Sequence, residues 1–128
     1  MVQVSLARGW DIEVERGPDL LFVRPRPLDT SAPGAASLAE QVWALLEQNF
    51  THRLVLELDE VGPLDSQLIG QLIWLQNRIH GHDGIMRICG LSSVNQELLR
   101  QCELEGHVPC YRDREEAVMG QPRPNRPR

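Results

Sequence analysis

The sequence lacks the groups that enzymes and metal proteins gather at one place. Its three cysteines and four histidines are scattered, with no CxxC pair and no spacing typical of a zinc site. No serine lies in the GxSxG context of a hydrolase nucleophile, and no glycine-rich loop is placed to cradle a phosphate. We therefore expect no catalytic residue, no metal and no cofactor. We expect the cysteines to be reduced, buried thiols that pack as small hydrophobic side chains.

Long apolar runs are also missing. No stretch approaches the roughly 18 consecutive apolar residues that a membrane-spanning helix needs. The first residues, MVQVSLAR, have neither the basic start nor the apolar centre of a signal peptide. These features predict a cytoplasmic protein that has no membrane partner.

Lysine is absent, so all 13 positive charges are arginines. Arg123, Arg126 and Arg128 lie in the last eight residues, which leaves 10 arginines against 18 acidic residues in positions 1–120, a net charge of −8. An acidic body repels a phosphate backbone, which argues against a nucleic-acid partner. The end of the chain, 121–128 (QPRPNRPR), offers no apolar side chain except proline, and we expect a disordered basic Pro/Arg tail there.

The chain of 128 residues is long enough for one domain with a substantial core. Apolar and polar residues alternate over 10–16, turn residues follow at 17–19, and an apolar segment begins at 20, which together predict an antiparallel hairpin. Prolines and glycine make 25–36 a loop. We expect residues 1–9 to be an N-terminal extension and residues 10–120 to form the domain.

Strands and helices are then expected to alternate. The serine-to-glutamate spacing of a capping box, Ser37 to Glu40, begins a helix that ends near Asn49. A central strand is expected at 53–58, followed by a helix at 66–80 and a strand at 85–89. Ser92 or Ser93 then caps a helix whose apolar face carries Val94, Leu98, Leu99 and Cys102. The last elements are a short edge strand at 108–111 and a helix at 114–119 capped by Asp113. Strands separated by single helices favour parallel pairing. The predicted fold class is α/β: a mixed sheet of four to five strands, with an N-terminal hairpin and about four helices packed on it.

The most informative segment begins with the apolar strand 54–59 (LVLELD) and continues into a helix that starts at Asp65 and Ser66. Asp65 is a good N-cap residue, because its carboxylate accepts backbone N–H bonds from the first turn. Ser66 then lies at the first helical position, near the positive end of the helix dipole, where a phosphoryl group would find free N–H groups. The simpler interpretation is that the Asp-Ser pair only begins the helix.

The helix at 66–80 has a broad apolar face, formed by Leu68, Ile69, Leu72, Ile73, Leu75 and Ile79. Trp74 falls on the opposite, polar side, together with Gln67, Gly70, Gln71 and Arg78. Two interpretations stay open for this tryptophan: it packs under a neighbouring helix or loop, or it is a partly exposed contact for a partner protein. Gly70, one turn earlier, would leave a notch that a partner side chain could enter.

In this order and spacing the segments resemble the STAS domain, the family of bacterial anti-sigma factor antagonists. The resemblance covers about residues 10–119. It is carried by the strand at 54–59, the helix start at 63–70 (PLDSQLIG), the strand and its exit at 85–92 (IMRICGLS), and Leu28-Asp29 after the hairpin.

The resemblance implies a regulatory function in which the protein is a substrate and not an enzyme. The hydroxyl residue after the motif aspartate, here Ser66, is the phosphate acceptor in this family. An anti-sigma factor with a kinase-type ATP site phosphorylates it and a phosphatase restores it; the unmodified form binds the anti-sigma factor and frees the sigma factor. The implied partner-binding residues are Asp29, Leu64, Asp65, Gln67, Leu68, Gly70, Gln71 and Trp74. A free antagonist is expected to be a monomer or a weak homodimer.

The sequence departs from the family pattern at two places. Gln67-Leu68 replaces the usual Ser/Thr-Gly, and Pro27 stands where the turn normally has an acidic or polar residue. Bulkier residues after Asp-Ser are similar to STAS proteins of stressosome scaffolds. An alternative is therefore a scaffold or a transporter-associated accessory subunit that binds partners without a phosphate cycle. An enzyme that uses Asp65 and Ser66 is a further alternative, and it requires a base within hydrogen-bond reach of the hydroxyl.

Overall fold

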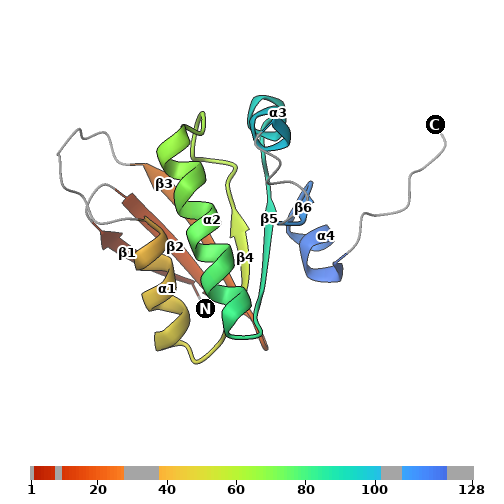
Figure 1. Cartoon of the computed structure of the whole chain (residues 1–128). Helices are drawn as coiled ribbons and strands as arrows, with labels where there is room; N and C mark the ends of the chain where they lie inside the picture. The colour runs from red at the N-terminus through yellow and green to blue at the C-terminus, as the bar shows by residue number, and fades with distance from the viewer. Residues whose placement is uncertain (1, 8–9, 28–37, 102–107, 121–128) are drawn as a thin grey trace.

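The computed structural model describes residues 2–7, 10–27, 38–101 and 108–120, with the side chains of residues 2–7 left out (Figure 1). These residues form a six-stranded sheet in the order β1-β2-β3-β4-β5-β6. The strands are β1 (Val2–Ala7), β2 (Trp10–Arg16), β3 (Leu21–Pro27), β4 (Arg53–Glu57), β5 (Ile85–Cys89) and β6 (Cys110–Tyr111). The first three strands are antiparallel, and β3, β4, β5 and β6 run parallel to one another.

Helices cover both faces of the sheet. They are α1 (Leu38–Gln48), α2 (Ser66–Gly81), α3 (Ser93–Gln101) and α4 (Arg114–Met119). Helices α1 and α2 lie side by side (Figure 1) and share with α3 the larger hydrophobic core. Ala117 of α4 packs in a smaller cluster with Phe22, Val55 and Cys89, whose side chains point to the other face. The two clusters follow from the alternation of side chains along each strand.

The predicted fold class, a mixed α/β sheet with an N-terminal hairpin and four packed helices, is confirmed. The sheet has one strand more than expected, because residues 2–7, expected to be part of an extension, pair with β2 from Val2↔Glu15 to Ala7↔Trp10. Strand β3 also continues through Pro25 and Pro27, which were expected in a loop. Strand β4 pairs with β3 only at residues 21–23, and proline is tolerated where a strand is paired on one side only.

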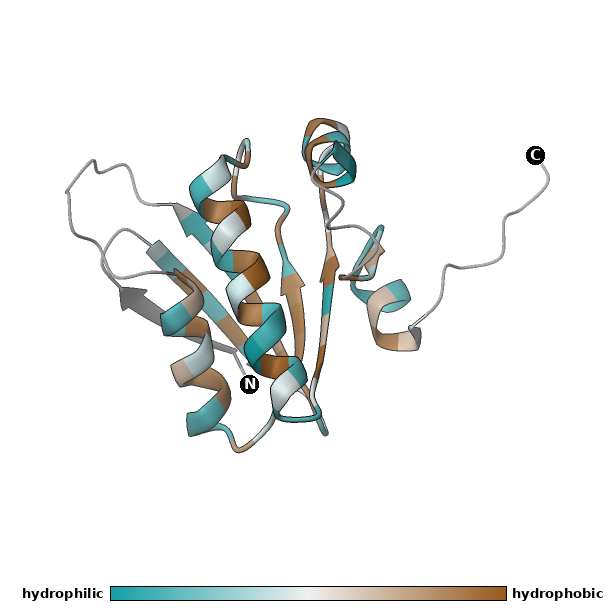
Figure 2. Ribbon diagram, in the orientation of Figure 1, coloured by the Kyte–Doolittle hydropathy of each residue, from teal (hydrophilic) through white to brown (hydrophobic). Residues whose placement is uncertain are grey.

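Figure 2 shows hydrophobic residues concentrated along β4, the central strand, and on part of the surface of α1 and α2. Helix α2 buries Leu68, Ile69, Leu72, Leu75 and Ile79, as predicted. Two residues expected on apolar faces are exposed: Ile73 to 39% and Val94 to 61%. Ile73 lies at the edge of the buried face of α2. The buried residues of α3 are Asn95 and Leu99, four positions apart, so its buried face is rotated away from Val94.

Cys89 is a buried, reduced thiol, as expected, whereas Cys110 is only half-buried. Burial, with Glu57 and Asp59 nearby, raises the pKa of Cys89 to about 12, so this thiol stays protonated at neutral pH. The Cys110 Sγ donates to the carbonyl oxygen of Val108 at 3.3 Å. Cys102 lies outside the described residues, as do Asp29, Ser37, His107 and the segment 121–128.

Arg114 attaches α4 to the sheet. Its Nε and Nη2 donate to the two carboxylate oxygens of Glu57 at 2.8 Å each, and its Nη1 donates to Glu15 Oε1 at 2.8 Å. The guanidinium lies 4.1 Å from the centre of the Phe22 ring. Hydrogen bonding to Arg114 lowers the pKa of the Glu15 carboxyl, and the bond to Glu57 raises the pKa of Arg114. Because Glu57 is only 4% exposed, removal of this partner would leave a buried carboxylate without its main hydrogen-bond donor.

We therefore expect Arg114→Met to lower the free energy of unfolding by about 3 kcal/mol, the low end of the range for a buried carboxylate that loses its partner. The low end applies because Arg24 Nε remains 3.8 Å from Glu57. Urea unfolding measures the change. The matched control is Arg100→Met, which removes an exposed arginine paired with Glu97 within α3 and should leave the urea midpoint unchanged. Equal effects of the two substitutions would contradict the assignment.

Candidate functional site

The site begins where β4 ends. The chain leaves the sheet with the Leu58 N–H donating to the Cys89 carbonyl oxygen at 2.9 Å, and it turns at Gly62, whose φ of 71° favours glycine. Asp65 then adopts an extended backbone as the N-cap of α2, and its Oδ1 accepts the Leu68 N–H at 2.8 Å. This confirms the predicted cap and makes Ser66 the first residue of the helix.

Ser66 is exposed. The first N–H groups of a helix have no partner within the helix, and one of them, that of Leu68, is satisfied here by the Asp65 side chain. A group bound to the Ser66 oxygen would thus lie in solvent at the positive end of the helix dipole, beside the carboxylate of Asp65. The geometry suits a side chain that is modified without disturbance of the core.

Asn95 of α3 fixes the loop that leads to Ser66. Its Oδ1 accepts the Leu64 N–H at 2.9 Å, and its Nδ2 donates to the Gly62 carbonyl oxygen at 2.8 Å. The Asn95 side chain is only 2% exposed, so both polar ends of the amide are satisfied inside the protein. The sequence interpretation missed this residue. The hint in the sequence was a polar side chain between the apolar residues of α3. Nothing in the sequence indicated its partner, Leu64, which lies 31 positions away.

The structure places the expected partner-binding residues in three groups. Gln67, Gly70 and Trp74 are exposed on α2 together with Ser66, and Asp65 is exposed at the N-cap. Leu64 and Leu68 are 5% and 8% exposed, so they belong to the core and support the surface from beneath. Gln71 is half-buried, and its Oε1 accepts the Ala39 N–H at 3.2 Å, at the start of α1. Asp29 lies outside the described residues.

Trp74 is 38% exposed, so no described helix or loop covers it completely. The Arg78 guanidinium lies 5.3 Å from the centre of its ring. A methyl group built on Gly70 would meet no atom within 4 Å, so the position one turn before Trp74 is open. The exposed surface of α2 therefore runs from Ser66 past an open notch to an indole ring.

The described histidines lie far from Ser66. The rings of His52 and His82 are 4.9 Å apart, and His82 is the C-cap of α2, at the opposite end of the helix from Ser66. His80 follows Ser66 by 14 positions, which corresponds to about 20 Å along a helix. None of these rings can act as a base for the Ser66 hydroxyl. Within the described ranges no three His, Cys, Asp or Glu side chains are grouped to hold a metal ion.

A protein-family model described as "STAS domain" matches residues 11–117. The chain belongs to the STAS domain family. The comparison with curated protein sequences found no match. Over the part of the chain that the structure describes, no helix is long and apolar enough to cross a membrane.

Solved structures have a similar fold. The protein TM1081 of Thermotoga maritima, a candidate anti-sigma factor antagonist, has a TM-score of 0.68 with 16% identity, over 84% of this chain and 91% of its own. An anti-sigma factor antagonist of Mycobacterium paratuberculosis also has a TM-score of 0.68 with 16% identity, over 94% of this chain and 93% of its own. The Bacillus cell fate determinant SpoIIAA, solved in its phosphorylated form, has a TM-score of 0.59 with 16% identity, over 85% of this chain and 97% of its own. At these identities the likeness shows the fold.

The Asn95 contacts lead to a testable expectation. Asn95→Ala leaves the buried Leu64 N–H without a partner, so the free energy of unfolding should fall by about 1–3 kcal/mol. Urea unfolding gives the value. Val94→Ala is the matched control, because this neighbouring side chain is 61% exposed, and its truncation should change stability by less than about 0.5 kcal/mol. An Asn95→Ala protein as stable as the control would show that the amide does not hold the loop.

Proposed function

We propose that this STAS protein is an anti-sigma factor antagonist that is switched at Ser66. In its unphosphorylated form it binds an anti-sigma factor that has serine kinase activity, and the sigma factor is released. Phosphorylation of Ser66 ends this binding, and a phosphatase restores it. The observation that carries the proposal is the position of Ser66, exposed at the first turn of α2 and next to its N-cap, Asp65.

The charge of a phosphoryl group explains the switch. Phosphorylation adds about −1.5 to −2 charges at neutral pH. The helix start receives this dianion without unfolding, because free N–H groups and the helix dipole stabilise it. A partner that covers Ser66 would have to desolvate the dianion beside the carboxylate of Asp65, which disfavours binding. The modification therefore changes docking and leaves the fold intact.

The proposed contact surface is the exposed side of α2 that begins at Ser66. Asp65, Gln67, Gly70 and Trp74 offer side chains or open space to a partner, and Gln71 is half-buried beside them. Leu64 and Leu68 hold this surface in place from the core. Asp29 belongs to the proposal through the family resemblance.

The departure from the family pattern after Ser66 changes the surface at only one position. Leu68 replaces a glycine but points into the core, so a partner meets only the larger Gln67. This favours an antagonist over a scaffold that binds partners without a phosphate cycle. The proposal includes a cytoplasmic location and a monomer or weak homodimer in solution.

Intact mass spectrometry after incubation with ATP and an anti-sigma kinase of the same genome tests the acceptor. We expect the wild-type protein to gain one phosphate and Ser66→Ala to gain none. Ser93→Ala is the matched control, because Ser93 is also an exposed serine in the first turn of a helix, and this variant should be labelled like the wild type. Labelling that persists in Ser66→Ala would refute the assignment of the acceptor.

Binding to the same kinase tests the switch. Ser66→Ala should bind the anti-sigma factor as the wild type does, whereas Ser66→Glu should bind at least about tenfold more weakly, about 1.4 kcal/mol. Isothermal titration calorimetry measures both affinities. Size-exclusion chromatography adds the oligomeric state, since a scaffold would elute as a large assembly. Equal affinities of the alanine and glutamate variants would contradict the switch.

A further inference from the structure

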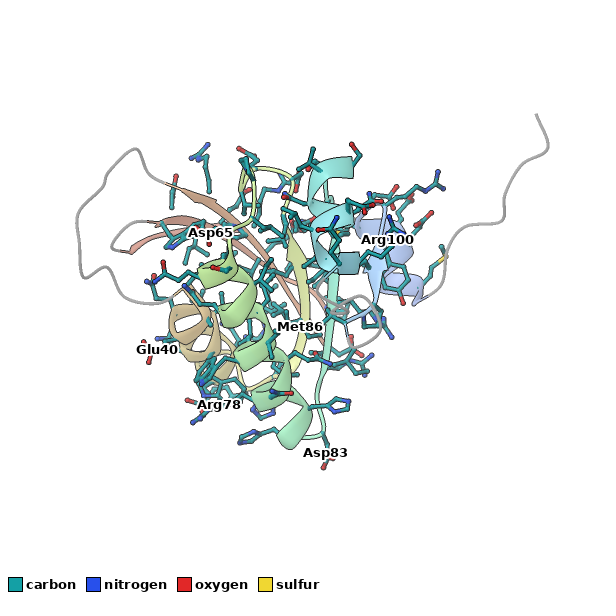
Figure 3. All side chains as sticks on the ribbon, turned by 45° about the horizontal axis from the view of Figure 1, so that its top comes forward. Glu40, Asp65, Arg78, Asp83, Met86 and Arg100 are labelled. Atoms are coloured by element: carbon teal, nitrogen blue, oxygen red, sulfur yellow. The ribbon has the colours of Figure 1, made fainter. Side chains whose placement is uncertain are left out.

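A second cluster lies at the C-terminal end of α2, away from Ser66. Figure 3 labels Asp65 and Arg78 at opposite ends of this helix. The buried Trp43 of α1 stacks on His52 with ring centres 5.3 Å apart, and the His82 ring lies 4.9 Å from Trp43. The cluster joins α1, α2 and the start of β4 through aromatic contacts.

Arg78 lies between two indole rings. Its guanidinium carbon is 5.3 Å from the centre of the Trp43 ring and 5.3 Å from the centre of the Trp74 ring. The Nδ1 of His82 lies 3.0 Å from the Arg78 carbonyl oxygen, which ties the end of the helix to the same cluster. Stacking on aromatic rings holds a guanidinium in place while its N–H donors in the plane remain available.

Arg78 has no acidic partner within the described residues. The ion pairs found there, with N···O distances up to 4.0 Å, involve Arg24, Arg26, Arg100, Arg112 and Arg114. The acidic residue that follows the helix, Asp83, lies at its far tip in Figure 3 and forms no ion pair with Arg78 among those of the described residues. Arg78 thus differs from these arginines: aromatic rings hold its guanidinium, and no described carboxylate neutralises it.

The exposed side of this cluster is a shallow groove of about 450 Å³, lined by Trp74, Asn77, Arg78, Gly81 and His82. A methyl group built on Gly81 would meet nothing within 4 Å, so the floor is open. The groove combines an apolar wall, an amide and a guanidinium. Its size suits a few side chains, and a few fixed polar groups give such a site its specificity.

We propose that this groove docks an acidic segment of a partner protein, with a partner carboxylate on Arg78 and a neighbouring apolar side chain against Trp74. Charge complementarity carries this choice: planar guanidinium groups bind carboxylates through paired N–H donors, and Arg78 is held ready for such a pair. The groove continues the exposed side of α2. The inference does not depend on phosphorylation of Ser66, and it is tested without ATP or a kinase.

The test is a titration followed by NMR of the tryptophan indole N–H signals. The probe is a short synthetic peptide of glutamate and leucine, compared with the same peptide with glutamine in place of glutamate and with inorganic phosphate alone. We expect the acidic peptide to move the Trp74 and Trp43 signals to saturation. Trp10, in β2, is an internal control whose signal should not move. The glutamine peptide and phosphate should produce at most a small fraction of these shifts.

Arg78→Gln should weaken binding of the acidic peptide about tenfold, as expected for loss of a charge-assisted pair. Arg16→Gln is the matched control, because Arg16 is an exposed arginine on β2 and should leave the affinity unchanged. Trp74→Ala, a change at a partly exposed position, provides a second variant and should also weaken binding. An unchanged Trp10 signal and melting temperature show that a variant is folded.

Four results would overturn the proposal. In the first, the acidic peptide leaves the Trp74 signal unchanged; in the second, the glutamine peptide binds as tightly as the acidic peptide. In the third, inorganic phosphate alone reproduces the shifts. In the fourth, the Arg78→Gln and Trp74→Ala proteins are folded and bind the acidic peptide with the wild-type affinity. The third result would identify a site for small anions in place of a protein docking site. Failure of Ser66 labelling would leave all of these readouts unaffected.

Discussion

The loop between β4 and α2 depends on one buried amide. Asn95 accepts the N–H of Leu64 and donates to the carbonyl oxygen of Gly62, so a helix 31 positions further along the chain sets the course of the segment that ends in Asp65 and Ser66. Without that amide the loop would bury polar backbone groups that have no partner, which is costly in a protein interior. A serine can be displayed at a constant place only if the loop before it has one conformation, and the side chain of Asn95 supplies that constraint.

Helix α2 combines two tasks because its faces differ. One face carries Leu72, Leu75 and Ile79 into the core shared with α1 and the sheet, which holds the helix rigidly. The other face remains exposed from Ser66 to Gly81 and carries little that stability requires. A phosphoryl group at the N-terminal end of α2, or a partner bound at its C-terminal end, therefore changes the exposed surface and does not require the core to rearrange.

The second face of the sheet shows how the fold tolerates buried charge. Glu57 is almost fully buried in the central strand, yet Arg114 of α4 holds both of its oxygens, and Arg24 lies nearby from β3. The same guanidinium packs on Phe22, so α4 is attached to the sheet by polar and apolar contacts at once. Because α4 is short, it buries little apolar surface. The ion pairs of Arg114 therefore determine where α4 lies on the sheet.

The sequence by itself determined the order of strands and helices and the start of α2 at Asp65 and Ser66, because caps and hydrophobic periodicity are local signals that a few neighbouring residues specify. It also indicated which side of α2 would be polar and placed Trp74 on that side, but it left open whether a neighbouring helix or loop would cover this tryptophan. It did not determine that β1 would join the sheet, that Leu64 would be sealed in the core, or that Asn95 and Arg114 would hold segments 31 and 57 positions away. Those contacts, like the stacking of Arg78 on Trp43 and Trp74, form only when the chain has folded. The reason is physical: a hydrogen bond or ion pair between distant residues needs both groups to be positioned by packing, and packing is a property of the whole tertiary structure.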